Sequence, residues 1–158
     1  MNVKNPWFWT LALIGLILDR TSKSWAADHF TAQGDTIPLL PNIFHLTYAL
    51  NTGAAFSLFS GGVDWLRWLS IGVSLALIVF ALVKRLLLIE QLGYGLVFAG
   101  AAGNGFCRFA YGHVVDFLDF RWINFPVFNL ADVFICIGII LLLGDSFRPS
   151  RSLHDPQS

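Results

Sequence analysis

Charged side chains are scarce in this sequence. They make up 13% of the 158 residues, whereas soluble domains carry roughly 25%. Hydrophobic residues account for 56%, and the mean hydropathy is +0.65. A net charge of zero gives no electrostatic basis for binding nucleic acid. This composition argues against an ordinary soluble domain and predicts one integral-membrane domain over residues 1–158.

Cysteine is also scarce, since Cys107 and Cys136 are the two that the sequence contains. Both lie inside apolar runs, which excludes a disulfide framework and a cysteine-rich metal site. A metal site on His113 and Asp116 is an alternative, but these residues do not form a zinc motif. Catalysis by Cys107 with His113 as its base is a second alternative, although a cysteine among aromatic residues is more typical of packing. We therefore predict neither a metal nor another cofactor.

Long apolar stretches dominate what is present. Four of them, residues 7–27, 63–83, 92–109 and 125–143, approach the ~20 residues that cross a bilayer. Residues 36–58 differ, because turn formers are followed there by β-branched and aromatic residues, which predicts short strands at the membrane surface. The predicted fold class is an all-α membrane protein with four transmembrane helices and a small extracytoplasmic β-cradle after the first span.

The lysines and arginines predict the orientation in the membrane. With four spans, the termini share one side with the loop that contains Lys84 and Arg85. The raw count is five cations on each side. Arg20, Lys23 and Arg108, however, lie within or at the ends of spans in polar company. The remaining cations favour cytoplasmic termini, so we expect a site that opens on the extracytoplasmic face.

Two aspartates near the C-terminal end are the principal candidates for chemistry. Asp116 and Asp132 flank one short segment at the mouth of the fourth span, where an ionisable group is costly. Two carboxylates held close tend to share one proton, so one can activate water while the other donates to a carbonyl oxygen. This pattern predicts peptide hydrolysis by an aspartic dyad. The alternative is two helix-end carboxylates facing water, with Asp132 favoured in the first turn by the helix dipole.

The other polar candidates gather near the outer ends of the predicted spans. So many costly groups at one depth favour a functional site, either an active site or the proton relay of a transporter. Asp19 and Lys23 share a helix face, but they could also form a plain charge pair near a helix end. Asn51 and Gly53 could likewise form a plain turn. These candidates are Asp19, Lys23, Asn51, Asn104, Arg108 and Asn129.

Five short motifs follow one another along the chain, and their order is informative. They are Leu-Asp-Arg-Thr-Ser-Lys at 18–23, Asn-Thr-Gly-Ala-Ala-Phe at 51–56, Ala-Gly-Ala-Ala-Gly-Asn at 99–104, Val-Val-Asp-Phe at 114–117 and Phe-Asn-Leu-Ala-Asp at 128–132. In this order and on four spans, the chain resembles bacterial lipoprotein signal peptidase, the type II or prolipoprotein signal peptidase. The resemblance extends over residues 7–143.

The resemblance implies an aspartic endopeptidase of the plasma membrane. Such enzymes remove signal peptides from prolipoproteins before a cysteine that carries diacylglycerol, so the implied partners are these substrates and membrane lipid, with the protein a monomer. Asp116 and Asp132 correspond to the catalytic dyad. The strands correspond to the surface cradle, and loops at 109–124 and near Gly53 are candidates for a lid. The residues implied to bind substrate or support the site are Asp19, Lys23, Asn51, Gly53, Asn104, Arg108, Asn129 and Ala131.

The sequence departs from the family pattern at Cys107. The family motif Gly-Asn-x-x-Asp-Arg has an aspartate at this position, beside the arginine that is Arg108 here. A carboxylate next to an arginine fixes it through charge-assisted hydrogen bonds. Without that carboxylate, Arg108 is freer, or it turns to Asp116 or Asp132. Three outcomes follow: full activity, reduced activity, or a relative that binds lipidated peptides without cutting them.

Overall fold

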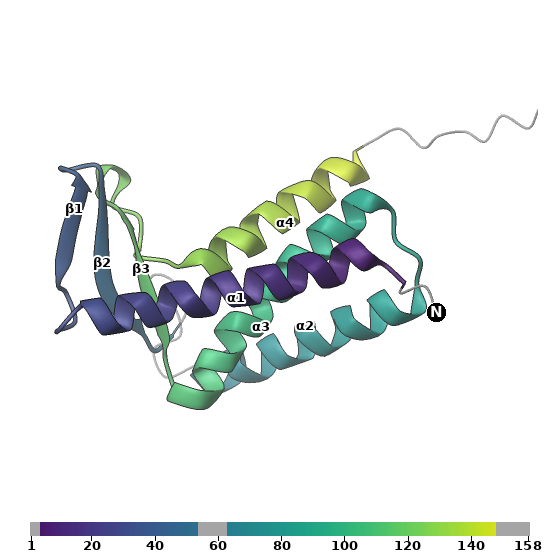
Figure 1. Cartoon of the computed structure of the whole chain (residues 1–158), viewed down its shortest axis with the longest axis horizontal. Coiled ribbons are helices and arrows are strands. Elements are labelled where there is room, and N and C mark those ends of the chain that lie inside the picture. The colour runs from purple at the N-terminus through teal and green to yellow at the C-terminus, as the bar shows by residue number, and fades with distance from the viewer. Residues whose placement is uncertain (1–3, 54–62, 148–158) are drawn as a thin grey trace, which may run out of the picture.

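The computed structural model describes residues 4–53 and 63–147. Its helices lie side by side along the long axis, and a three-stranded sheet stands at one end of them (Figure 1). In chain order the elements are α1 (Pro6–His29), β1 (Thr36–Leu40), β2 (Phe44–Asn51), α2 (Val63–Val83), α3 (Leu88–Tyr111), β3 (Val114–Phe120), the 3₁₀ helix η2 (Arg121–Ile123) and α4 (Leu130–Ser146).

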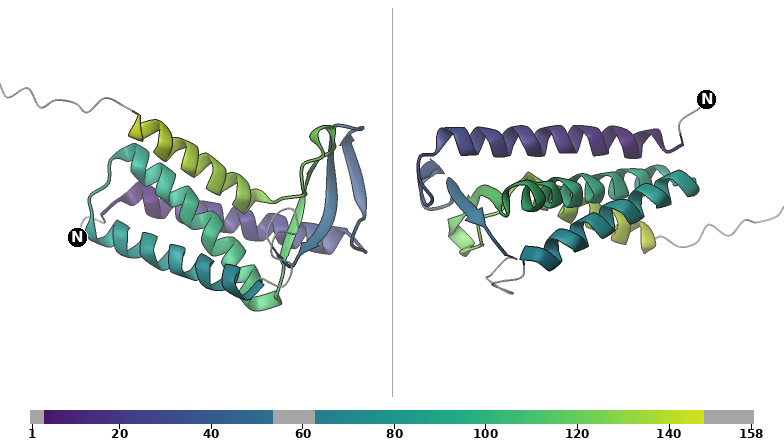
Figure 2. Two further views of the ribbon diagram at one scale, coloured as in Figure 1. Left: turned by 180° about the vertical axis from the view of Figure 1, so that it is seen from behind. Right: turned by 90° about the horizontal axis from the view of Figure 1, so that it is seen from below.

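Helix α3 is the central element of the bundle. It packs against α1, α2 and α4, whereas the other helices pack less against one another (Figure 2). Glycines permit this arrangement, because a Cβ atom at Gly138 would lie 2.6 Å from the carbonyl oxygen of Gly93. A Cβ atom at Gly100 would overlap the carbonyl oxygen of Ala131. Small residues allow helix backbones to approach closely in membrane bundles, so α3 and α4 meet almost backbone to backbone.

The start of α1 is attached to the end of α2. Pro6 occupies the first turn, where its missing N–H costs nothing, and Asn5 before it adopts a left-handed conformation with φ of 54°. The buried amide of Asn5 donates to the carbonyl oxygens of Ala81 at 2.7 Å and Lys84 at 2.8 Å. Its oxygen accepts a hydrogen bond from the N–H of Leu86 at 2.9 Å. One side chain thus joins α1 to the short connection between α2 and α3.

The sheet is antiparallel with the order β1-β2-β3 and packs at the C-terminal end of α1. A small apolar core holds it there, formed by Ala26 and Phe30 of the α1 end and Phe117 of β3. In the pairing of β2 with β3, Ala49 lies opposite Asp116, and an irregularity between Leu46 and Ala49 shifts the register. This pairing brings the end of β2 beside the strand that carries Asp116.

The structure corrects the prediction that residues 109–124 form a flexible lid. Residues 114–120 form β3, because a run of valine and phenylalanine meets the free edge of β2. Residues 36–58 were expected to be strands, and β1 and β2 confirm this expectation as far as Asn51. The second lid candidate, near Gly53, lies largely outside the described residues.

Two helices begin at other residues than the predicted spans do. Helix α4 begins at Leu130 and not at residue 125, because Asn129 caps it and Phe128 pairs with β3, donating its N–H to Leu118 at 3.0 Å. Helix α3 begins at Leu88, four residues before the predicted start at residue 92. The Glu90 carboxylate accepts the N–H of Leu87 at 2.7 Å and so satisfies a free donor at the helix start.

Within the described residues, one helical stretch is long and apolar enough to cross a membrane, namely Trp65–Val83 of α2. Helix α1 carries Asp19 and Lys23, α3 is rich in glycine and carries Asn104, and α4 has 17 residues. The predicted count of four spans therefore stays a prediction. The protein is mostly helical with one small sheet, which agrees with the coarser fold class.

Candidate active site

Asp116 is buried although it belongs to a strand of the small sheet at one end of the bundle (Figure 1). It is 2% exposed on β3, and two amide side chains donate to its carboxylate. The Nδ2 atom of Asn51 lies 2.9 Å from Oδ2, and the Nδ2 atom of Asn129 lies 2.6 Å from Oδ1. Each carboxylate oxygen therefore has one fixed donor, which sets the orientation of the carboxylate plane.

Asp132 occupies the third position of α4 and forms a capping box with Asn129. Its Oδ2 accepts the N–H of Asn129 at 3.1 Å, and its own N–H donates to the Asn129 side chain at 3.3 Å. The alternative of a first-turn carboxylate at a helix start is thus correct in part. Its other oxygen, however, accepts from the Nδ2 atom of Asn104 at 2.8 Å, and this bond directs Asp132 into the polar cluster.

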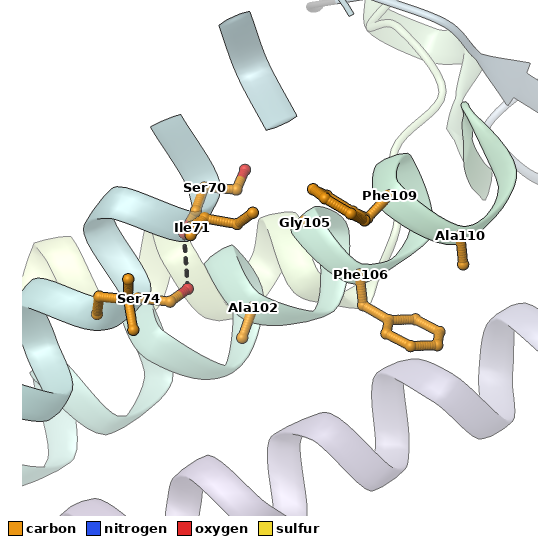
Figure 3. Close-up of a pocket in the computed structure, with 9 residues that line it drawn as sticks. Ser70, Ile71, Ser74, Ala102, Gly105, Phe106, Phe109 and Ala110 are labelled. Atoms are coloured by element: carbon orange, nitrogen blue, oxygen red, sulfur yellow. Dashed lines mark hydrogen bonds between the residues drawn. The ribbon is translucent and has the colours of Figure 1, made fainter. Parts of the chain in front are cut away.

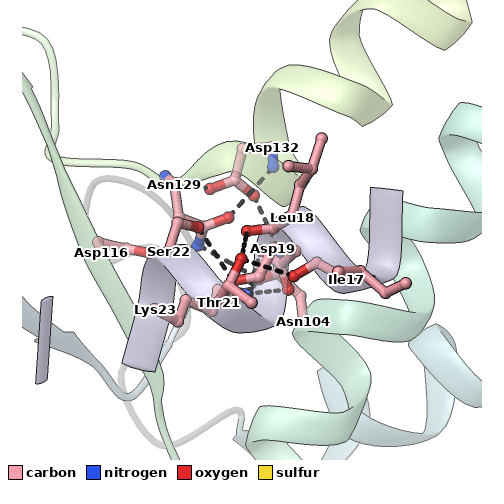
Figure 4. A network of polar contacts seen from close by, with 10 residues as sticks. All are labelled: Ile17, Leu18, Asp19, Thr21, Ser22, Lys23, Asn104, Asp116, Asn129 and Asp132. Carbon is pink, nitrogen blue, oxygen red and sulfur yellow. Dashed lines mark hydrogen bonds and ion pairs between the residues drawn. The ribbon is translucent and has the colours of Figure 1, made fainter. Parts of the chain in front are cut away.

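Asn129 joins the two aspartates. The side chain of this fully buried residue donates to Asp116, while its backbone N–H donates to Asp132. Figure 4 shows the side chains of α1, α3, β3 and α4 converging around it. The charge of Asp132 also acts on the Asp116 carboxyl. The structure thus brings the two predicted dyad members into one site.

Asn104 connects the two aspartates to a buried ion pair on α1. Its Oδ1 accepts from Lys23 Nζ at 2.7 Å and from Asn129 Nδ2 at 3.2 Å. Lys23 also pairs with Asp19 at 2.8 Å, and both side chains are 2% exposed. The prediction that these residues face the interior is therefore confirmed. A Cβ atom at Gly103 would overlap the Asp19 carboxylate, so glycine is required where α3 passes this pair.

Gly53 and Ala131 act through their backbones. The N–H of Gly53 donates to the Oδ1 atom of Asn51 at 2.9 Å and leaves the amide nitrogen directed at Asp116. Asn51 therefore does both things expected of it: its side-chain oxygen accepts a hydrogen bond in a turn, and its side-chain nitrogen donates to a buried carboxylate. Ala131 is fully buried where α3 and α4 cross, with its carbonyl oxygen against Gly100 of α3. Gly53 thus orients the Asn51 side chain, and Ala131 lets α3 and α4 approach closely.

Arg108 is the predicted site residue that the structure leaves least fixed. Its Nε is buried and has no hydrogen-bond partner in residues 4–53 and 63–147. The charges of Asp132 and Asp116 act on it, but no hydrogen bond or ion pair within the described chain joins it to either aspartate. Cys107 beside it is buried and offers no carboxylate. The sequence left two arrangements open, an Arg108 that is less fixed or one that turns to Asp116 or Asp132. The described residues show the first, because Arg108 forms no hydrogen bond to either aspartate.

Burial raises the pKa of Asp116 from 3.8 to about 6. The hydrogen bond from Asn51 opposes this effect, because it favours the ionised form, and the charge of Asp132 adds to it. The hydrogen bond from Asn129 lowers the pKa as well, but less than burial raises it. Asp116 therefore keeps its proton to a higher pH than an ordinary aspartate, as one member of an aspartic dyad would.

The described residues contain no group of three or more His, Cys, Asp or Glu side chains that could hold a metal ion. His113 packs near the ring of Tyr111, with 6.2 Å between ring centroids. Sequence reasoning identified the polar residues of the cluster but missed strand β3, which carries one of them. The alternation of valine, phenylalanine and aspartate after Gly112 was the signal that could have revealed it.

An apolar pocket lies apart from the polar cluster, between α2 and α3 (Figure 3). Its volume is about 360 Å³, and Gly105 of α3 forms part of its wall where Ser70 of α2 comes close. The lining residues are Ser70, Ile71, Ser74, Leu75, Ala102, Gly105, Phe106, Phe109 and Ala110. None of them is part of the hydrogen-bonded network around the aspartates.

Residues 11–148 match the family model described as signal peptidase (SPase) II. The chain is 61% identical over 153 residues to a lipoprotein signal peptidase of Microcystis aeruginosa, covering 96% of this chain and 98% of the relative. It is 59% identical over 153 residues to a lipoprotein signal peptidase of Gloeothece citriformis, covering 96% of both. A solved structure described as a bacterial membrane enzyme superposes with a TM-score of 0.80 at 31% identity, over 96% of this chain and 93% of that chain.

Proposed function

Because the chain belongs to the signal peptidase II family, we propose that Asp116 and Asp132 cleave signal peptides from diacylglyceryl-modified prolipoproteins. The family is one of membrane proteases, and relatives more than half identical over nearly the whole chain are named lipoprotein signal peptidases. Neither a transporter nor a non-catalytic binding protein is favoured by these relatives.

The observation that carries this proposal is the contact of Asn129 with both carboxylates. Its side chain lies 2.6 Å from Asp116, and its backbone N–H lies 3.1 Å from Asp132. A residue that contacts both aspartates holds them at one point, where a water molecule and a scissile carbonyl can meet both. A plain helix cap on α4 would require the bond to Asp132 but not the bond to Asp116.

The raised pKa of Asp116 suggests which aspartate acts as the acid and which as the base. Asp116 carries the proton and donates it to the oxygen of the scissile carbonyl. Asp132 takes a proton from a water molecule, whose oxygen attacks the carbonyl carbon. The resulting tetrahedral diol breaks its C–N bond as the departing amine gains a proton from the dyad. The products are a free carboxyl group and a free amine, with no covalent intermediate.

The surface of the bundle is consistent with four spans and an extracytoplasmic site. Exposed apolar side chains cover the helices on the outside, among them Leu13 of α1 (61% exposed), Val79 of α2 (59%) and Ile140 of α4 (67%). The polar groups are inside, near the end where the sheet stands. We place this end at the outer face of the plasma membrane and both termini in the cytoplasm, with the monomer as the working unit.

The test is cleavage of a diacylglyceryl prolipoprotein by the purified chain in detergent. Asp116→Asn and Asp132→Asn should each lower kcat by at least about 10³-fold, because either change removes a member that transfers a proton. The matched control is Asp119→Asn, which alters a buried carboxylate on the same strand that binds Thr47 and Arg121 outside the site. This control should cleave at close to the wild-type rate.

Two results would contradict the proposal. Cleavage by either dyad variant at the wild-type rate would show that the reaction does not need that carboxylate. Absence of cleavage by the folded wild-type chain, with a positive signal from a known signal peptidase II in the same assay, would remove the activity itself.

A further inference from the structure

Arg20 lies beside the polar cluster but faces away from it. While its neighbour Asp19 is buried, Arg20 is exposed on α1 and lies against the end of α3. Its guanidinium carbon is 5.3 Å from the ring centroids of both Phe106 and Tyr111. It also donates to the Tyr111 hydroxyl at 2.6 Å. No carboxylate in the described part of the chain forms an ion pair with it, so two aromatic rings hold a cation that lacks a counter-charge.

A cavity of about 230 Å³ lies next to this cation, between α1 and α3. We call it the Arg20 groove. It is lined by Leu16, Asp19, Arg20, Gly103, Phe106 and Cys107. Asp19 is already paired with Lys23, and the remaining wall is largely apolar. Figure 3 shows Phe106 directed from α3 toward α1, and Phe106 is one of the residues that line the groove.

The groove has a polar end and an apolar end. Arg20 lies at the level of Tyr111, the last residue of α3. Leu16 lies one helical turn, about 6 Å, nearer the middle of the bundle. Arg20 lies within α1 but beside the last turn of α3, and an arginine among aromatic rings at a helix end is typical of the membrane–water interface. This position would set the charge at headgroup depth and the apolar wall at the depth of acyl chains.

We propose that the Arg20 groove binds a phospholipid, with the lipid phosphate on Arg20 and an acyl chain along Leu16 and Phe106. Guanidinium groups bind phosphate through parallel N–H donors, and Tyr111 leaves several of these donors of Arg20 available. The diacylglyceryl group of the proposed substrate carries no phosphate. The ligand is therefore a resident lipid of the bilayer and chemically distinct from the peptidase substrate.

Binding is tested by native mass spectrometry on the full chain in a non-ionic detergent, titrated with phosphatidylglycerol. Diacylglycerol with the same acyl chains is the phosphate-free comparison, and we expect it to bind at least about fivefold more weakly. Soluble glycerol 3-phosphate, which lacks acyl chains, should not compete. Competition at equal concentration would place a soluble phosphate in the groove and overturn the lipid assignment.

Two variants separate the charge from the groove. Arg20→Gln removes the phosphate partner, and Leu16→Trp fills the groove while keeping the charge; each should weaken phosphatidylglycerol binding by about fivefold or more. The matched control is Arg85→Gln, which removes an exposed arginine at the opposite end of the bundle. Its binding should stay within about twofold of wild type.

Equal losses from Arg20→Gln and Arg85→Gln would show non-specific attraction to positive charge and overturn the proposal. Wild-type binding by folded Leu16→Trp would overturn it as well. Circular dichroism identifies variants that fail to fold. If Arg20→Gln fails, the comparison of Leu16→Trp with wild type still decides the question, because that variant leaves the Arg20 contacts in place.

Discussion

Four oxygen atoms define the site at the level of single residues. Each oxygen of Asp116 and Asp132 accepts one hydrogen bond, from Asn51, Asn129 or Asn104. The identity of the aspartates could be predicted from the cost of burying charge and from the motif order. The sequence could not predict which amide donates to which carboxylate oxygen. That arrangement depends on the strand register that places Ala49 of β2 opposite Asp116 of β3. No local pattern in the sequence specifies that register.

The buried Asp116 should make the stability of the protein depend on pH. Its pKa is about 6 in the folded chain, against an ordinary value of 3.8 for an aspartate, so the folded state binds more protons between these values. The free energy of unfolding therefore falls as pH rises from about 4 to about 6, by up to about 3 kcal/mol.

Asp116→Asn should abolish this fall, measured by denaturant unfolding in mixed micelles across that range. Asp28→Asn, at an exposed position of α1, is the control. An unchanged pH slope in Asp116→Asn would refute the expectation.

Cys107 offers a second test at this scale. The Nε of Arg108 is buried without a partner in the described chain, and Cys107→Asp would restore the family's carboxylate at the preceding residue, in the wall shared with Asp19 and Arg20. Because a carboxylate there adds a negative charge near Lys23, Arg20 and Arg108 and favours an ordered set of cations beside the proposed dyad, we expect kcat/KM to rise about three- to tenfold. Cys107→Ser removes the thiol without adding charge and should stay near wild type. The measurement is steady-state cleavage of the lipidated precursor, and a fall in kcat/KM for Cys107→Asp would contradict the argument.

Helices and strands differ in how well the sequence predicted them. The four apolar stretches all became helices, because each contains enough helix-compatible residues to satisfy its own backbone. Strand β3 was missed because it depends on β2, which is more than sixty residues away in the chain. The start of α4 was misplaced for a related reason. Residues 125–128 are apolar enough for a span, but Asn129 caps the helix after them.

The close approach of α3 and α4 should be sensitive to a single methyl group. Gly138→Ala would bring a Cβ atom to 2.6 Å from the Gly93 carbonyl, and since backbone cannot easily yield, we expect a loss of about 1–3 kcal/mol. Gly144→Ala is the matched control on the same helix, because nothing lies within 4 Å of its added Cβ. That control should be neutral or stabilise by up to about 1 kcal/mol. Thermal unfolding in detergent measures both, and equal melting temperatures would disprove the packing argument.

At the scale of the whole molecule, the polar cluster around the two aspartates is buried, while many large apolar side chains are exposed along the described helices. Composition predicted an integral-membrane protein, because 13% charged residues is well below the roughly 25% of soluble domains. The end of the bundle that holds the site could not be predicted from composition. It follows from the sheet, which ends at Asn51 beside Asp116 and so fixes the site at the sheet end.

The proposed orientation can be tested with cysteine labelling in whole cells. In a Cys107→Ser, Cys136→Ser background, Ala32→Cys near the sheet should react with a membrane-impermeant maleimide added from outside. Lys84→Cys, at the opposite end of the bundle, should react only after lysis. Both positions are exposed, so accessibility within the protein does not limit the reaction. Labelling of the Lys84→Cys variant in intact cells would reverse the topology.

The position of α3 at the centre has a consequence for how the chain enters the membrane. Helices α1 and α2 are synthesised first, yet both find their main packing partner in α3, which comes later. Until α3 is present, Lys23 cannot form its hydrogen bond to Asn104. Of the two hydrogen bonds described for Lys23, the bond to Asp19 is then the one that α1 can form by itself. A pair of opposite charges four residues apart neutralises itself on a lone helix. The ion pair within α1 should therefore lower the cost of holding this helix in lipid before α3 is made.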